Sequence, residues 1–138
     1  MNSGMTPYEL RAIPLLTDAS DAALQRVAAA AGEMTYHAGQ ILALQGDAGS
    51  GMFLILDGTV LVEWRGGTAE LGAGNFVGEL TLLAPGGTRN ARVRAVTEVR
   101  CLALGRDDAL ELIESEPSVA LTMLKEVARR FASALPDE

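Results

Sequence analysis

Residues 52–74 read MFLILDGTVLVEWRGGTAELGAG, a series of short apolar runs separated by glycine-containing turns. The runs Met52–Leu56 and Val60–Trp64 flank Asp57–Gly58, a dipeptide that favours a tight turn. Short apolar runs at such regular spacing are typical of antiparallel sandwiches and barrels. This stretch therefore predicts consecutive antiparallel strands.

The strand pattern extends from about residue 34 to about residue 104, and helical patterns lie on both sides of it. Apolar residues recur at helical spacing over about residues 7–32 and about residues 106–134. We therefore expect residues 1–138 to form a single α+β domain. Its centre is predicted to be an antiparallel β-roll (a double-stranded β-helix, jelly-roll-like) flanked by N- and C-terminal helices.

Local signals predict where individual helices begin and end. Asp18 or Ser20 can cap an N-terminal helix, and Gly32 lies where its C-terminal cap would fall. Ser115 is expected to cap the last helix, with Pro117 in its first turn. The apolar stripe predicted for that last helix consists of Leu124, Val127, Ala128, Phe131 and Leu135.

The composition argues against several functional classes. The formal net charge of −7 disfavours binding to nucleic acid or to anionic membranes, because both require surplus basic groups. The chain has one histidine, His37. A zinc or iron site with two or three imidazole ligands therefore cannot be built. A Ser-His-Asp or Cys-His arrangement would need a well-placed histidine, which His37 does not supply. We therefore expect a non-enzyme with no metal and no cofactor.

The chain is expected to be cytoplasmic. Its apolar runs fall short of the ~20 residues needed to span a membrane. No basic residue precedes an apolar segment in residues 1–8, as a secretory signal would require. The single cysteine, Cys101, excludes an intramolecular disulfide and fits a reducing compartment. It lies in the apolar run Val99–Leu104, which predicts a buried and inert thiol, whereas His37 is expected at the surface.

One segment combines residue types that suit an anionic ligand: residues 74–95, GNFVGELTLLAPGGTRNARVRA. Gly78 has no side chain to block a ligand, and the short helix expected after it would point free amide N–H groups at an anion. Arg89 can pair bidentately with phosphate oxygens. Glu79, when ionised, can only accept hydrogen bonds, so its natural partner is a ribose hydroxyl. Together these residues predict a sugar-phosphate site.

The same segment resembles the phosphate-binding cassette of the cyclic-nucleotide-binding domain family, whose pattern is roughly F-G-E-L-A-L-L, a spacer, and R-x-A-x-V-x-A. Residues 76–91 form the cassette here, and residues 39–47 and 52–58 look like two further signatures of the family. The resemblance covers nearly the whole chain. It implies a β-roll of the catabolite-activator or protein-kinase-A regulatory-subunit type, standalone and without a DNA-binding domain. The cassette positions in register are Phe76, Gly78, Glu79, Leu80, Leu82, Leu83, Arg89, Ala91, Val93 and Ala95.

The resemblance implies a 3′,5′-cyclic nucleotide as the ligand. Its phosphate would lie at the amides of Gly78–Leu80 and at Arg89, and its ribose at Glu79. Asn90 follows the arginine, where relatives often carry alanine, serine or threonine, and a hydroxyl there tends to help hold guanine. We therefore favour cAMP over cGMP, although the asparagine leaves the choice open. Val77 stands where the family usually has phenylalanine.

The resemblance also implies where the base lies and how binding is transmitted. Val62 and Leu71 align with positions that line the base pocket, and Ala91 completes the arginine motif. In the family a C-terminal helix covers the base, and in transcription factors it also forms the dimer interface. Here the chain stops soon after Phe131, so base contacts are expected mainly from the barrel. The C-terminal helices are expected to move on binding and are a candidate surface for a homodimer or a protein target.

A second reading assigns the chain to a different class. In it the β-roll binds no nucleotide and acts as a protein-interaction or regulatory module of a larger assembly. Glu79 and Arg89 would then form an ordinary ion pair between two loops.

Overall fold

The computed structural model describes residues 4–43, 51–78 and 91–134. Helices occupy both ends of this described chain, and the strands lie between them. In chain order the elements are α1 (Pro7–Leu10), η1 (Pro14–Leu16), α2 (Asp21–Ala30), β1 (Gly32–Tyr36), β2 (Ile41–Ala43), β3 (Gly51–Asp57), β4 (Val60–Trp64), β5 (Gly67–Leu71), β6 (Phe76–Val77), β7 (Ala91–Ala95), β8 (Val99–Gly105), α4 (Arg106–Ser115) and α5 (Pro117–Ala134).

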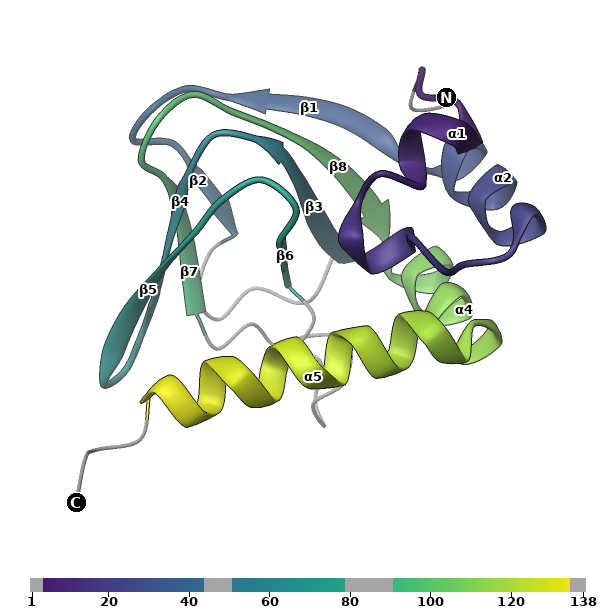
Figure 1. Ribbon diagram of the computed structural model, residues 1–138. Helices are drawn as coiled ribbons and strands as arrows, with labels where there is room; N and C mark the ends of the chain where they lie inside the picture. The colour runs from purple at the N-terminus through teal and green to yellow at the C-terminus, as the bar shows by residue number, and fades with distance from the viewer. Residues whose placement is uncertain (1–3, 44–50, 79–90, 135–138) are drawn as a thin grey trace.

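The described strands pair into two antiparallel sheets. One sheet has the strand order β1-β8-β3-β6 and the other has the order β2-β7-β4-β5. The sheets form a β-roll, with α1, α2 and α4 gathered at one end and α5 running along one side of it (Figure 1). The α+β class and the β-roll predicted from the sequence are therefore confirmed.

Strand β3 is buried on both faces and separates two apolar clusters. Met52 and Leu54 belong to a cluster packed against the helices, whereas Phe53 and Ile55 belong to a cluster inside the roll. This alternation follows from the two-residue period of a strand. The roll-side cluster consists of Leu42, Phe53, Ile55, Val60, Leu71, Val77, Val93, Ala95, Val99 and Cys101. The helix-side cluster includes Leu10, Leu16, Leu54, Phe76, Leu102, Leu104, Val119 and Met123.

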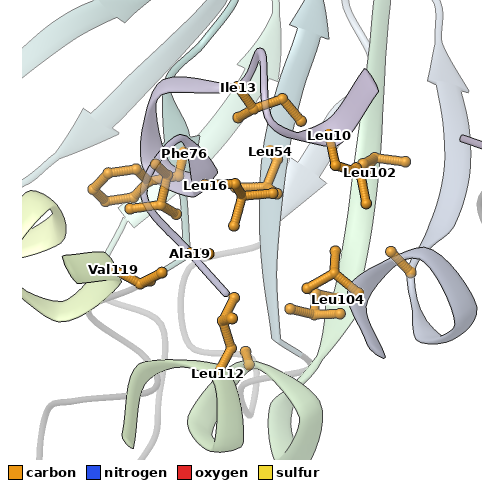
Figure 2. Packing of buried hydrophobic residues seen from close by; sticks show 14 of the residues in the cluster. Leu10, Ile13, Leu16, Ala19, Leu54, Phe76, Leu102, Leu104, Leu112 and Val119 are labelled. Atoms are coloured by element: carbon orange, nitrogen blue, oxygen red, sulfur yellow. The ribbon is translucent and has the colours of Figure 1, made fainter. Parts of the chain in front are cut away.

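The helix-side cluster joins the N- and C-terminal helices to the sheet. Figure 2 shows Leu16 beside Phe76 and Leu54, with Val119 approaching from α5. All four side chains are at most 2% exposed. Burying a side chain of leucine size contributes roughly 1.5–3 kcal/mol, so this cluster holds β6 and α5 to the same core.

Helix α2 begins as predicted but ends differently. Ser20 is its N-cap, and the Ser20 hydroxyl oxygen accepts a hydrogen bond from the Ala23 amide at 3.1 Å. The prediction that Gly32 caps the other end is wrong. Ala31 is the C-cap in an extended conformation, and Gly32 is the first residue of β1. Because the chain passes directly from helix to strand, no left-handed residue is needed there.

The junction of α4 and α5 also differs from the prediction. Ser115 does not cap α5 but is the last residue of α4, and Glu116 separates that helix from Pro117, the first residue of α5. The Glu116 carboxylate accepts hydrogen bonds from the Ser20 amide at 2.7 Å and from the Ser20 hydroxyl at 3.1 Å. This contact attaches the junction to the start of α2.

Helix α5 buries a stripe that agrees with the predicted one at Val127 but not at Leu124. Val119 and Met123 are buried and Val127 is partly buried against the helix-side cluster. Leu124, which the prediction placed in the stripe, is 64% exposed, and Leu121 is 51% exposed. The sequence offers two apolar faces on this helix, and packing selects the one that reaches the core. Among the described residues no helix, α5 included, is long and apolar enough to cross a membrane.

The single cysteine and the single histidine have the environments expected of them. Cys101 is fully buried in the roll-side cluster, and burial followed by the nearby Glu33 carboxylate raises its pKa to about 11. A thiol of that pKa stays protonated at neutral pH and is a poor nucleophile. His37 is exposed, with its Nδ1 atom 3.9 Å from a carboxylate oxygen of Glu98.

Candidate ligand-binding site

The structure describes half of the predicted site residues. Val62 and Leu71 lie on β4 and β5, Gly78 follows β6, and Ala91 begins β7. The other four predicted residues lie outside the described residues, within 79–90: Glu79, Leu80, Arg89 and Asn90.

The two described ends of the cassette lie on different sheets. β6 pairs with β3 in one sheet, and β7 pairs with β2 and β4 in the other. Gly78, directly after β6, has φ +95°. Residues with a side chain rarely adopt this left-handed backbone conformation, so the position favours glycine. The cassette therefore connects the two sheets of the roll.

On β4, β5 and β7, the inner face of the β2-β7-β4-β5 sheet carries three cross-strand rows. In antiparallel pairs, opposed residues point to the same face, and residues two apart share it. Because Val60, Leu71 and Ala95 are opposed and belong to the roll-side cluster, they define the inner face. The next rows on that face are Val62, Ala69 and Val93, and then Trp64, Gly67 and Ala91.

Exposure increases along these rows toward the cassette. In the first row Val60 and Ala95 are 0% exposed and Leu71 is 5% exposed. In the third row Trp64, Gly67 and Ala91 are all half-buried. The inner face is therefore most buried at the Leu71 row, which we call the closed row, and more exposed at the Ala91 row, which we call the open row.

The predicted base-contacting residues occupy different depths of this face. Val62 is half-buried in the middle row, and Leu71 is in the closed row. The structure places both on the inner face and Ala91 at its open end; their contact with a base stays a prediction. Trp64 lies on the same face and was not among the predicted site residues. Trp64 lies two residues after Val62 in a predicted strand, and residues two apart share a face, so the sequence alone could have identified it.

The outer face of the same sheet carries charged residues. A carboxylate oxygen of Glu63 lies 3.6 Å from Arg92 Nε and 3.4 Å from Arg94 Nε. Arg92 is exposed and Arg94 is half-buried. These two arginines are therefore on the face opposite the candidate site.

Helix α5 contacts β6 through Arg130. The Arg130 guanidinium lies 4.6 Å from the centroid of the Phe76 ring, and its Nη2 donates a hydrogen bond to the Phe76 carbonyl at 2.7 Å. Phe76 is two residues before Gly78, so this contact lies beside the start of the cassette. A cation over an aromatic face is an attractive contact when it is partly desolvated. The sequence analysis did not identify this pair.

The Glu126 carboxylate supports Arg130 from the same helix. Glu126 accepts hydrogen bonds from Arg129 at 3.0 and 2.6 Å and from Arg130 Nε at 2.9 Å. The hydrogen bonds from Arg129 first, and then those from Arg130, lower the Glu126 pKa, although burial opposes the shift. The i, i+4 spacing of Glu126 and Arg130 was a readable signal for this pairing.

Replacing Glu126 with glutamine is expected to destabilise the attachment of α5 by on the order of 1 kcal/mol. Because the folded pKa is lowered, the carboxylate stabilises the protein above the ordinary pKa of glutamate. That contribution is lost as the pH falls through the folded pKa. Thermal unfolding should be measured from neutral pH to below the folded pKa of Glu126. The unfolding temperatures of wild type and Glu126→Gln should differ at neutral pH, and the difference should disappear in acid. Glu114→Gln, an exposed substitution on α4, is the matched control, and equal curves for Glu126→Gln and Glu114→Gln would contradict the prediction.

A separate hollow between α2 and α4 is too small for an organic ligand. It encloses about 20 Å³ and is lined in part by Arg26, Leu104 and Asp108. That volume holds about one water molecule. The open inner face of the β2-β7-β4-β5 sheet is therefore the better candidate.

Comparison with known proteins gives the family. The sequence matches the model of the cyclic nucleotide-binding domain over residues 33–116, more than half of the chain. It is 38% identical over 119 residues to a cyclic nucleotide-gated potassium channel of Rhizobium etli, a match that covers 86% of this chain and 33% of the channel. The chain spans about a third of the length of the first curated relatives it matches.

Two solved structures extend the comparison. The catabolite activator protein of Thermus thermophilus superposes with a TM-score of 0.68 at 33% identity, covering 88% of this chain and 59% of that one. The regulatory domain of Toxoplasma gondii PKA, solved with cAMP, superposes with a TM-score of 0.78 at 21% identity. The match covers 92% of this chain and 50% of that one, and it shows a similar fold. The matched model is that of a binding domain, which supports the expectation of a non-enzyme. The match over residues 33–116, together with the β-roll, shows that this chain belongs to the cyclic nucleotide-binding domain family.

Proposed function

We propose that this domain binds a 3′,5′-cyclic nucleotide at the open end of the inner face, with cAMP preferred over cGMP. The observation that carries the proposal is the gradient of exposure from the closed Leu71 row to the open Ala91 row. It leaves an apolar inner surface directly beside the end of the cassette. An apolar recess with a few polar groups at its rim is the usual form of a small-molecule site.

The phosphate and ribose are assigned to the cassette. The amides of Gly78–Leu80 and the Arg89 guanidinium would hold the cyclic phosphate, and Glu79 would accept a hydrogen bond from the ribose 2′-hydroxyl. The left-handed backbone at Gly78 supports this assignment because it lets the chain turn as it leaves β6.

The base is assigned to the inner face of the roll. Val62 and Leu71 would contact it from β4 and β5, and Ala91 from the start of β7. The preference for cAMP rests on Asn90, which replaces the hydroxyl that tends to help hold guanine in relatives. The T. gondii domain, whose fold is similar, was solved with cAMP.

Binding would be transmitted through α5. Arg130 joins α5 to Phe76, and β6 leads directly to Gly78, so a shift of the cassette would act on the helix through this contact. A ligand moves such an equilibrium only if it binds one arrangement more tightly than the other. The exposed Leu121 and Leu124 on α5 are the candidate surface for a protein target or a second copy. We keep the cytoplasm as the proposed compartment.

Titration calorimetry of the whole chain with cAMP and with cGMP tests the proposal. We expect binding of both nucleotides, tighter for cAMP. We also expect a rise in unfolding temperature, because ligand at a hundred times its Kd stabilises the native state by about 2.7 kcal/mol. Absence of both heat and stabilisation with either nucleotide would refute nucleotide binding and favour the interaction-module reading. Tighter binding of cGMP would refute only the choice of base.

A further inference from the structure

Trp64 is the one tryptophan of the chain and ends β4 at the open row of the inner face. It shares this face with Val60 and Val62, because residues two apart on a strand point the same way. Its cross-strand partners are Gly67 on β5 and Ala91 on β7. The Trp64 indole is thus flanked by glycine and alanine, the two smallest residues.

The indole packs against Gly67. A Cβ atom built on Gly67 would lie 3.0 Å from Trp64 Cζ2 and 3.2 Å from Cε2. The ring therefore lies against the backbone of β5, in a position that depends on the absence of a side chain at residue 67. Trp64 remains half-buried there, so part of its ring is accessible.

The position of Ala91 connects this ring with the ligand. Ala91 is the first described residue after the cassette and stands directly across from Trp64. A nucleotide held by the cassette and directed into the roll would pass this row before it reaches Val62. Purine bases stack on aromatic side chains through their π-faces.

We propose that Trp64 stacks on the base of the bound nucleotide at the open end of the roll. The inference rests on the proposed function and adds a residue that determines selectivity. The larger ring system of a purine covers more of the indole than a pyrimidine does, so Trp64 favours purine over pyrimidine cyclic nucleotides. Trp64 emission reports the event directly, since no other tryptophan contributes.

The test measures the affinity of the whole chain for cAMP and for the pyrimidine analogue cyclic CMP, by calorimetry and by Trp64 emission. We expect Trp64→Leu to bind cAMP about 5-fold or more weakly, from stacking energies of roughly 1–3 kcal/mol per base. The preference for cAMP over cyclic CMP should shrink in the same variant. Trp64→Phe, which keeps a π-face, should lose less than Trp64→Leu.

Two further variants separate stacking from a structural role. Gly67→Ala has room only if the indole moves by a few tenths of an ångström, so it should weaken cAMP binding while Trp64 is retained. Gly67→Ala also tests the stacking role if Trp64→Leu fails to fold. Glu63→Gln, the neighbour on the outer face, is the matched control and should bind both nucleotides as wild type does.

The outcomes distinguish this inference from the proposed function. Unchanged cAMP affinity in Trp64→Leu, with wild type binding normally, overturns the stacking role and leaves the nucleotide site intact. Equal losses for cAMP and cyclic CMP also overturn it, because a merely structural role would produce them. If wild type gives no binding heat with any nucleotide, the proposed function and the stacking role fail together.

Discussion

Arg89→Ala is expected to weaken cyclic-nucleotide binding by roughly 30- to several-thousand-fold, or about 2–5 kcal/mol. Its guanidinium is the group assigned to neutralise the cyclic phosphate. Glu79 is assigned to the same site and would bring a second negative charge there, so removal of the arginine would leave two anions without a cation. Titration calorimetry with the preferred nucleotide measures the loss. Arg89→Lys should lie between wild type and the alanine variant, because lysine keeps the charge without the planar pair of donors.

Arg92→Ala is the matched control for this experiment. It removes the same type of side chain three positions further along the chain, but Arg92 is exposed on the outer face beside Glu63. We expect its nucleotide affinity to equal that of wild type, and its stability to fall only slightly, because exposed ion pairs contribute little. Equal affinities of Arg89→Ala and wild type would refute the assignment of Arg89 to the phosphate.

Gly58→Ala is expected to lower the free energy of unfolding by about 3 kcal/mol or more. Gly58 has φ +95°, in the region that side chains rarely adopt. A Cβ atom there would also lie 2.2 Å from the Glu98 carbonyl oxygen and 3.0 Å from Val99 Cα. Both neighbours are backbone atoms and cannot rotate away. The turn joins β3 to β4 and thus one sheet to the other, so a shift would disturb both.

Gly39→Ala separates the two causes of that loss. Gly39 has φ +90°, close to the value at Gly58, but among the described residues no heavy atom would come within 4 Å of its added Cβ. We expect a loss of about 1–2 kcal/mol from the backbone conformation alone. Urea unfolding of the two variants gives the difference that belongs to the contact with Glu98. If Gly58→Ala costs no more than Gly39→Ala, the contact is relieved by a rearrangement and the argument is wrong.

Features that depend on a few neighbouring residues could be predicted from the sequence. The turn signal at Asp57–Gly58 and the Ser20 cap each depend on a few adjacent positions. Ser20 caps α2, and Gly58 joins β3 to β4, although these two strands belong to different sheets and do not pair. Burial of Cys101 followed from the apolar run around it. These features hold because hydrogen bonding and backbone preference within a short segment favour one conformation.

Features that depend on distant partners were predicted less well. Leu124 and Val127 are both apolar residues of α5, yet Leu124 faces away from the core and Val127 packs partly against it. The helical period allows either face to be buried, and only the position of η1 and the sheet selects one. Gly32 likewise has the residue type of a cap but begins a strand, because β8 is available to pair with it.

The sequence by itself determined the fold class, the family and the residue types of the cassette, because these follow from local periodicity, turn chemistry and ordered motifs. Only the tertiary structure decided which residues share the open end of the roll. Trp64, Gly67 and Ala91 meet there through the pairing of β4 with β5 and β7, and Arg130 meets Phe76 through the packing of α5. Cross-strand register and helix packing arise from burial of apolar surface across the whole chain, so residue type and spacing within one segment do not specify these contacts.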